Sequence, residues 1–175
     1  MTHEATPKNT SALSPAVVIT PEQLLEHWQG HRRLTRRVIA AFPEDPFFRF
    51  SIGGMRPFSA LALELIGMAK AGIRGLATGQ WTLVDELTHH SKAPAPRTQE
   101  DFLRLWDEAT EQINTLGPQI PPQRYQEIDK AFGEYEGHVY QFLLYWIDNE
   151  IHHRGQGYVY LRALGIEPPP FYVRN

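Results

Sequence analysis

The longest helical pattern in the chain, residues 137–165, constrains the fold most, because two polar side chains lie within its apolar face. Asn149 and His153 are one helical turn apart, the spacing by which a helix offers two ligands to one metal ion. An unpaired buried polar group costs roughly 1–3 kcal/mol, so each needs a partner inside the fold. The other positions of this face recur every three or four residues: Val139, Phe142, Trp146, Gly157, Tyr160 and Leu164.

The composition limits the classes of protein and of metal site. The chain has 175 residues, of which 42% are hydrophobic, which suits one compact domain with a real core. A net charge of -3 gives no electrostatic reason to expect nucleic acid or an acidic membrane as a partner. Because cysteine is absent, disulfides, a cysteine nucleophile and thiolate metal sites are excluded. Any metal would bind histidine, carboxylate, amide or water ligands, which favours zinc, nickel, iron or manganese.

The N-terminal stretch shows no helical periodicity. Residues 1–17 are polar and lack the apolar core of a secretory signal, so we expect a mobile tail followed by a single domain over residues 18–175. The longest apolar run, Phe142 to Ile147, is too short to cross a bilayer. We therefore expect a cytoplasmic protein with no membrane partner.

Four amphipathic helices are predicted. The first begins at Thr20, which can form a capping box with Gln23, and two prolines end it. The second begins at Pro57 and closes at residues 78–80. The third begins after Thr98, a suitable N-cap residue, and the fourth is the long segment described above.

The connections between these helices predict how they assemble. Residues 79–98 form a long connection that contains a Pro-Ala stretch too rigid for a helix. Residues 123–136 are expected to be a polar connection or a single loose turn, and no convincing alternation predicts a strand. The pattern therefore predicts an all-α fold, a four-helix bundle with a long crossover between helices two and three.

Further polar residues accompany Asn149 and His153 on inward-facing positions. Glu64 lies within the apolar stripe of the second helix, where a carboxylate must be paired, ligated or protonated. Glu64, Asn149 and His153 could converge on a metal, with His31 or Glu150 as a further ligand or a supporting group. Such an oxygen-rich set would favour manganese, iron or magnesium. A metal-free hydrogen-bond network among the same residues satisfies them equally well.

Other polar residues are expected to have structural roles. His31 is expected to be a packed or hydrogen-bonded core histidine rather than a ligand. Arg154 is expected on the outer or interfacial side of the last helix, paired with Asp148 or Glu150. The two histidines at 89–90 are expected in solvent.

The segment NEIHHRGQGYVYLRALGIEPP resembles the C-terminal signature of the DinB/YfiT-like superfamily, H-x-x-x-H-R-G-Q followed by a helical continuation and a Gly-Pro ending. The rest of the chain is consistent with it, with a tryptophan in the first helix and G-x-W after the second. The resemblance implies a four-helix bundle, often a homodimer, that holds zinc or nickel with three histidines. One of these comes from helix two and two come from helix four. Members with an assigned activity include transferases and isomerases that use bacillithiol or mycothiol.

The ligands of that superfamily carry over only in part. His153 matches the last histidine, whereas Asn149 stands where the preceding one is expected. The helix-two position falls at residues 64–66, where Glu64 is the only residue able to bind a metal. The chain thus departs from the pattern at two of the three ligands.

Two functions remain open. The first is a divalent-metal-dependent enzyme, a thiol S-transferase or a hydrolase-like protein, with a small-molecule substrate or thiol and a homodimeric assembly. No catalytic residue is assigned. The second is a non-catalytic, stress-related binding or dimerisation bundle whose metal site has decayed and holds no metal.

Overall fold

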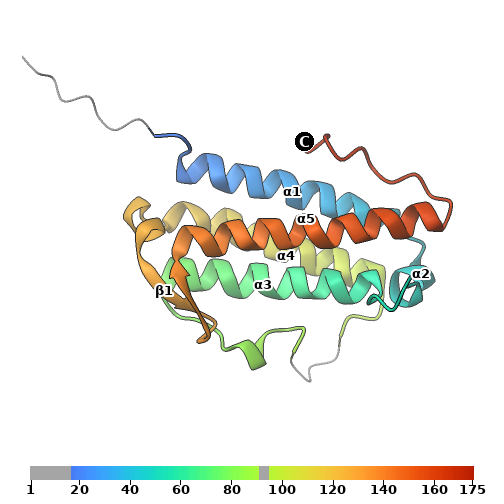
Figure 1. The fold of residues 1–175 in the computed structure, drawn as a ribbon, viewed down its shortest axis with the longest axis horizontal. Helices are drawn as coiled ribbons and strands as arrows, with labels where there is room; N and C mark the ends of the chain where they lie inside the picture. The colour runs from blue at the N-terminus through green and yellow to red at the C-terminus, as the bar shows by residue number, and fades with distance from the viewer. Residues whose placement is uncertain (1–16, 91–94) are drawn as a thin grey trace, which may run out of the picture.

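The long helices form an elongated bundle in the computed structural model, which describes residues 17–90 and 95–175. Figure 1 shows α1 and α5 running in one direction and α3 and α4 in the other. Both α1 and α3 contact α4 and α5, which closes the bundle. The predicted four-helix bundle with a long crossover between the second and third long helices is confirmed. The four long helices are α1 (Pro21–Ala41), α3 (Phe58–Thr78), α4 (Gln99–Leu116) and α5 (Val139–Ala163).

Shorter elements join these helices, and the sequence did not predict most of them. Residues 123–136 were expected to be a polar connection or a single loose turn. They contain a 3-10 turn and also an antiparallel hairpin, whose register pairs Ile128 with His138. The strands have four residues each and mostly exposed side chains. They therefore lack the alternation of apolar and polar residues from which a strand is predicted. The shorter elements are α2 (Glu44–Arg49), η1 (Val84–Glu86), η2 (Gly117–Gln119), η3 (Pro122–Gln126), β1 (Ile128–Ala131) and β2 (Tyr135–His138).

Local chemistry fixes where the long helices begin and end. Thr20 and Gln23 form the predicted capping box of α1, and Thr98 caps α4 by accepting a hydrogen bond from the backbone N–H of Asp101. Gly79 ends α3 with a φ of 71°, in the left-handed region that favours glycine. These boundaries agree with the sequence prediction.

The predicted mobile tail, residues 1–17, lies outside the described residues except for its last position. Within the described part of the chain, no helix is both long enough and apolar enough to cross a membrane.

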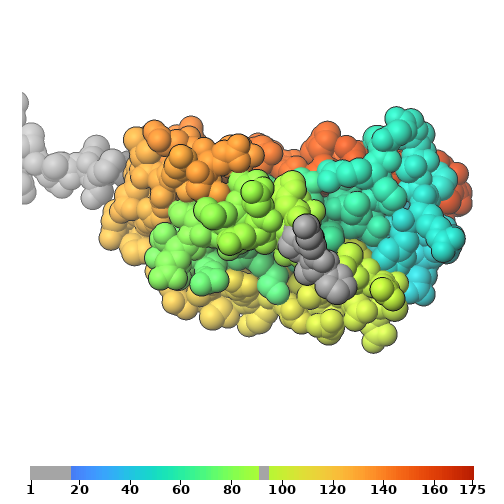
Figure 2. All heavy atoms as spheres, turned by 90° about the horizontal axis from the view of Figure 1, so that it is seen from below, coloured from blue at the N-terminus to red at the C-terminus, as the bar shows by residue number. Residues whose placement is uncertain are grey.

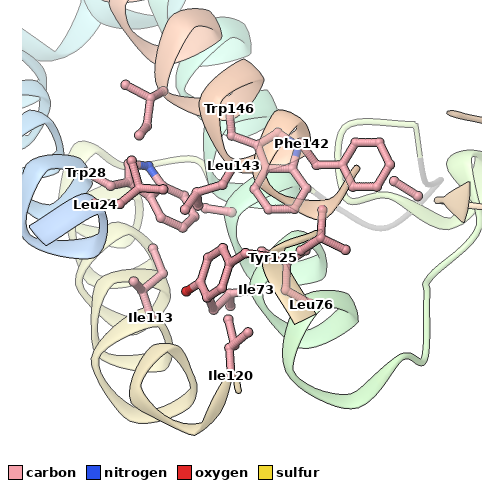
Figure 3. Close-up of a cluster of buried hydrophobic side chains, with 14 of the residues drawn as sticks. Leu24, Trp28, Ile73, Leu76, Ile113, Ile120, Tyr125, Phe142, Leu143 and Trp146 are labelled. Carbon is pink, nitrogen blue, oxygen red and sulfur yellow. The ribbon is translucent and has the colours of Figure 1, made fainter. Parts of the chain in front are cut away.

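The core consists of two apolar clusters, one toward each end of the bundle. Figure 3 shows the first, in which Trp28 from α1 and Trp146 from α5 lie near Ile73 of α3 and Tyr125 of η3. The second cluster is rich in aromatic rings, and Phe42 stacks on Phe58 with ring centroids 4.9 Å apart. Polar groups that hold the helices in register lie between and beside these clusters.

Glycines let aromatic rings pack directly against helix backbones. A Cβ added to Gly157 would lie 2.5 Å from the Phe58 ring, and one added to Gly72 would lie 2.5 Å from Trp146. At Gly157 the neighbouring helix α3 therefore approaches α5 closely. In contrast, nothing lies within 4 Å of a Cβ added to Gly155, two residues earlier on α5.

Substituting these two glycines by alanine should have opposite effects. Gly157→Ala should lower the free energy of unfolding by about 1–3 kcal/mol, because its methyl group overlaps the Phe58 ring. Gly155→Ala should leave stability unchanged or raise it by up to about 1 kcal/mol, because alanine is the better helix former. Urea unfolding of both variants checks this, and equal losses in both would contradict the packing at Gly157.

Candidate functional site

A cluster of polar side chains joins α3 to α5. The Glu64 Oε1 atom lies 3.1 Å from Nε2 of His153 and 3.2 Å from Nδ2 of Asn149. Because α3 and α5 are antiparallel, the first half of one helix meets the second half of the other. The structure thus brings together the three residues for which the sequence predicted a common site.

Arg56 is a fourth member of the cluster that sequence reasoning missed. Its Nη2 atom lies 2.7 Å from Oε2 of Glu64. The guanidinium therefore binds the carboxylate oxygen that Asn149 and His153 do not contact. The Arg56 backbone carbonyl accepts a hydrogen bond of 2.9 Å from the hydroxyl of Tyr160. No periodicity signals this residue, because it lies in the connection before α3.

The Glu64 carboxylate is held in its ionised form. Burial raises the pKa of Glu64, but hydrogen bonds from His153, Arg56 and Asn149 outweigh burial and lower it to about 2. An ionised carboxylate only accepts hydrogen bonds. In the hydrogen bond between His153 and Glu64, the proton is therefore on Nε2 of His153. The other ring nitrogen, Nδ1, is buried and has no hydrogen-bond partner among the described residues.

Glu64 and Arg56 form the polar end of a cleft of about 510 Å³. Residues 84–90 lie along one side of the cleft, and the hairpin and the start of α5 lie along another. Figure 2 shows the segment 79–90 in green on the molecular surface, beside the orange start of α5. Most of the lining is apolar, which is typical of sites for small organic molecules. The aromatic lining residues are Phe132, Tyr135, Phe142, Tyr145 and Trp146.

Both histidines of the 89–90 pair line this cleft. The expectation that they lie in solvent is wrong for His89, which is partly buried and whose Nδ1 atom is buried without a hydrogen-bond partner among the described residues. Gly67 of α3 makes room for it, since a Cβ there would lie 3.2 Å from that nitrogen. Burial, and then the neighbouring His90, lower the pKa of His89.

His31 and Glu150, predicted as further ligands or supporting groups, lie instead where α1 contacts α5. The carboxylate of Glu150 accepts a hydrogen bond of 2.6 Å from the hydroxyl of Thr35. His31 is hydrogen-bonded to Arg154 at 3.0 Å and to His27 at 3.2 Å. The structure therefore separates them from Glu64, and His31 is the hydrogen-bonded core histidine that the sequence predicted.

The prediction that Arg154 lies on the outer or interfacial side of α5 is wrong. Only 6% of the residue is exposed, and its guanidinium lies 3.9 Å from Glu150, one of the two partners predicted for it. Arg32 lies 3.9 Å from the same carboxylate, and its guanidinium stacks over the Trp106 ring at 4.0 Å. This second network ties α5 to α1 and α4, as the first ties it to α3.

The Glu64 cluster does not fit a resident divalent metal. A histidine binds a metal through an unprotonated nitrogen and gives its other N–H to an acceptor, whereas His153 turns a protonated Nε2 toward Glu64 and has no partner at Nδ1. Asn149 also presents its NH₂ group to Glu64, and the cation Arg56 holds the remaining oxygen. Among the described residues, no group of three or more histidine, aspartate and glutamate side chains could hold a metal ion.

Fold and site together define an all-α bundle whose core carries a charged cluster at the end of an apolar cleft. The sequence pattern of the DinB family matches residues 8–175. The chain therefore belongs to the DinB family.

Solved structures of DinB-like proteins share the fold. A DinB-like protein from Bacillus subtilis, YjoA, has a TM-score of 0.68 and 18% identity, over 87% of this chain and 99% of its own. A DinB-like protein from Bacillus cereus ATCC 10987 has a TM-score of 0.65 and 17% identity, over 86% and 97%. A DinB family member from Exiguobacterium sibiricum 255-15 has a TM-score of 0.65 and 20% identity, over 86% and 95%. At such identities the likeness shows the fold alone, and no curated protein matches the chain.

The environment of His31 predicts how stability changes with pH. Burial, and then the charges of Arg154 and Arg174, lower the pKa of His31 from 6.5 to about 3. Between these values the unfolded chain binds a proton that the native chain does not, so acidification below about pH 6.5 favours unfolding.

The variant His31→Gln lacks this proton linkage. Between pH 7 and pH 5 the free energy of unfolding should fall in both proteins, and the fall should be roughly 1–2 kcal/mol smaller in His31→Gln than in the wild type. Urea unfolding at several pH values measures the two slopes. His152→Gln, at an exposed position, should keep the wild-type slope. Parallel curves for His31→Gln and the wild type would contradict the assigned environment.

Proposed function

We propose that the cleft binds a small organic electrophile and a low-molecular-weight thiol, and that the protein transfers the thiol to the electrophile. The observation that carries this proposal is the cleft itself, which has an apolar aromatic body and a cation, Arg56, at its polar end. The aromatic side chains would hold the organic part of the substrates. The guanidinium would stabilise the thiolate, because a neighbouring positive charge lowers the pKa of a thiol.

The transfer needs a group that accepts the thiol proton. Glu64, with a pKa of about 2, is too weak a base for this task. His89 is the better candidate, because it lines the cleft and its lowered pKa keeps it unprotonated at neutral pH. In the proposed step the S–H proton moves to His89 while the sulfur forms a bond to an electrophilic carbon. The leaving group departs with its electron pair, so no oxidant or reductant is required.

One observation favours a second function, that of a non-catalytic binding bundle. Both oxygens of Glu64 accept hydrogen bonds, from Arg56, Asn149 and His153, so the cluster can stand as a structural network. In that case the cleft would bind a ligand without changing it. Product formation separates the two functions, since only the first yields a thioether.

The thiol-transfer proposal predicts measurable rates with bacillithiol, mycothiol or cysteine as thiol and monochlorobimane as electrophile. Arg56→Gln and Tyr145→Ala should each lower kcat/KM by about tenfold or more, through loss of the thiolate-stabilising charge and of the aromatic wall. Tyr172→Ala is the matched control, because Tyr172 is an exposed tyrosine that does not line the cleft. Fluorescence and mass spectrometry of the product measure the rates.

A rate at the uncatalysed level with all three thiols would contradict transferase activity. Ligand binding that is lost in Tyr145→Ala would then support the non-catalytic function. A chelator should leave the rate unchanged, since no step of the proposal uses a metal. Loss of activity on chelation, restored by added metal, would instead favour the metal-dependent enzyme predicted from the sequence.

The solvent face of α5 supports a homodimer as the assembly. Leu144, Ile151 and Val159 are 43%, 40% and 52% exposed on one side of the helix. Exposed apolar side chains aligned in this way are typical of interfaces.

We expect light scattering to give the mass of two chains for the wild type and of one chain for Val159→Glu, because a buried carboxylate without a partner destabilises the interface. Glu134→Gln, on the exposed hairpin turn, should leave the mass unchanged. A wild-type mass of one chain would contradict the dimer.

A further inference from the structure

We propose that Arg56 is the resident cation of this site, and that it neutralises Glu64 and keeps divalent metals out. The charge of Glu64 requires a compensating cation, because only 16% of its side chain is exposed. The structure supplies one in the guanidinium of Arg56, 2.7 Å away. A guanidinium stays charged at every physiological pH, so this compensation does not depend on metal supply.

The backbone around Arg56 holds the residue in place. Its carbonyl oxygen accepts the hydroxyl of Tyr160, a residue with 0% exposure, and the next residue, Pro57, is the N-cap of α3. The backbone of Arg56 is therefore fixed eight residues before Glu64, about two helical turns away along the chain. The side chain is 51% exposed, so it can leave the carboxylate without disturbing the core.

A divalent metal would have to overcome three contacts to use this site. It would displace Arg56 from Oε2 or bind beside a positive charge, at an electrostatic cost. It would also require His153 to move its proton from Nε2 to Nδ1, where no described residue accepts it. Finally, Asn149 would have to turn its oxygen toward the metal and give up its hydrogen bond to Glu64.

The first of these barriers can be removed by substitution. In Arg56→Gln the neutral side chain no longer repels a metal, and Glu64 loses its compensating charge. Arg56→Gln should therefore bind Mn²⁺ or Zn²⁺ about tenfold or more tightly than the wild type. Arg56→Lys keeps a positive charge and should bind metal as weakly as the wild type.

The experiment is a calorimetric titration of the untagged full chain with MnCl₂ and with ZnCl₂. The variants are Arg56→Gln, Arg56→Lys and the double variant Arg56→Gln with Glu64→Gln, and Arg49→Gln serves as a control because Arg49 is an exposed arginine outside the cleft. The unfolding temperature with and without metal gives a second readout for each variant, since a metal that binds the native state raises it.

A gain of affinity in Arg56→Gln that disappears in the double variant supports the proposal. Equal affinity in the wild type and Arg56→Gln overturns it, whether both bind metal or neither does. A gain that persists in the double variant also overturns it, because the metal then binds elsewhere.

This inference rests on the proposed function for the location of its site, but its test does not use the thiol assay. If thiol transfer fails while Arg56→Gln gains metal, the role of Arg56 stands and the transferase proposal falls. If thiol transfer succeeds while metal affinity does not change, the transferase proposal stands and the role of Arg56 as the barrier to metals falls.

Discussion

The ionised carboxylate of Glu64 is the group on which the arrangement of this bundle depends. It lies on the inner side of α3, largely withdrawn from water, and it stays charged because donors from two other segments reach it. Two of these donors, Asn149 and His153, set the register of α5 against α3. The third, Arg56, sets the path of the chain into α3, with help from the hydroxyl of Tyr160. A charge that needs several donors at once therefore specifies the positions of three segments.

The helix α5 carries polar groups toward two neighbours, which explains how one helix can organise the bundle. Its Asn149 and His153 meet α3, whereas Glu150 and Arg154 meet α1. Apolar packing between and beside these networks supplies most of the favourable burial, and it tolerates sliding better than a hydrogen bond does. The networks instead specify which residues face one another. The cleft lies at one side of α5. Its mostly apolar lining includes the charged pair of Arg56 and Glu64.

The parts of the structure that could be predicted are those governed by neighbours in the chain. The cap at Thr20, the end of α3 at residues 78–80 and the inward position of Glu64 depend on contacts within one or two helical turns. The burial of Arg154 could not be predicted in this way, because periodicity shows which stripe is apolar but not how far neighbouring helices cover its flanks. His89 was misplaced for a related reason. It lies in a connection without periodicity, and its burial depends on the space that Gly67 leaves on another element.

The sequence by itself determined the four long helices, their ends, and the fact that Glu64, Asn149 and His153 point inward, since helical periodicity and capping act between residues close in the chain. Only the tertiary structure decided what satisfies those residues. The partners of Glu64 on α5 are separated from it by 85 and 89 positions, and their distances depend on how two helices pack. Arg56 is near in sequence but lies in a loop, whose path is fixed by a contact with Tyr160, 104 residues away. For this reason the sequence could indicate a charged site in the core, whereas the choice of an arginine as its cation followed from the fold.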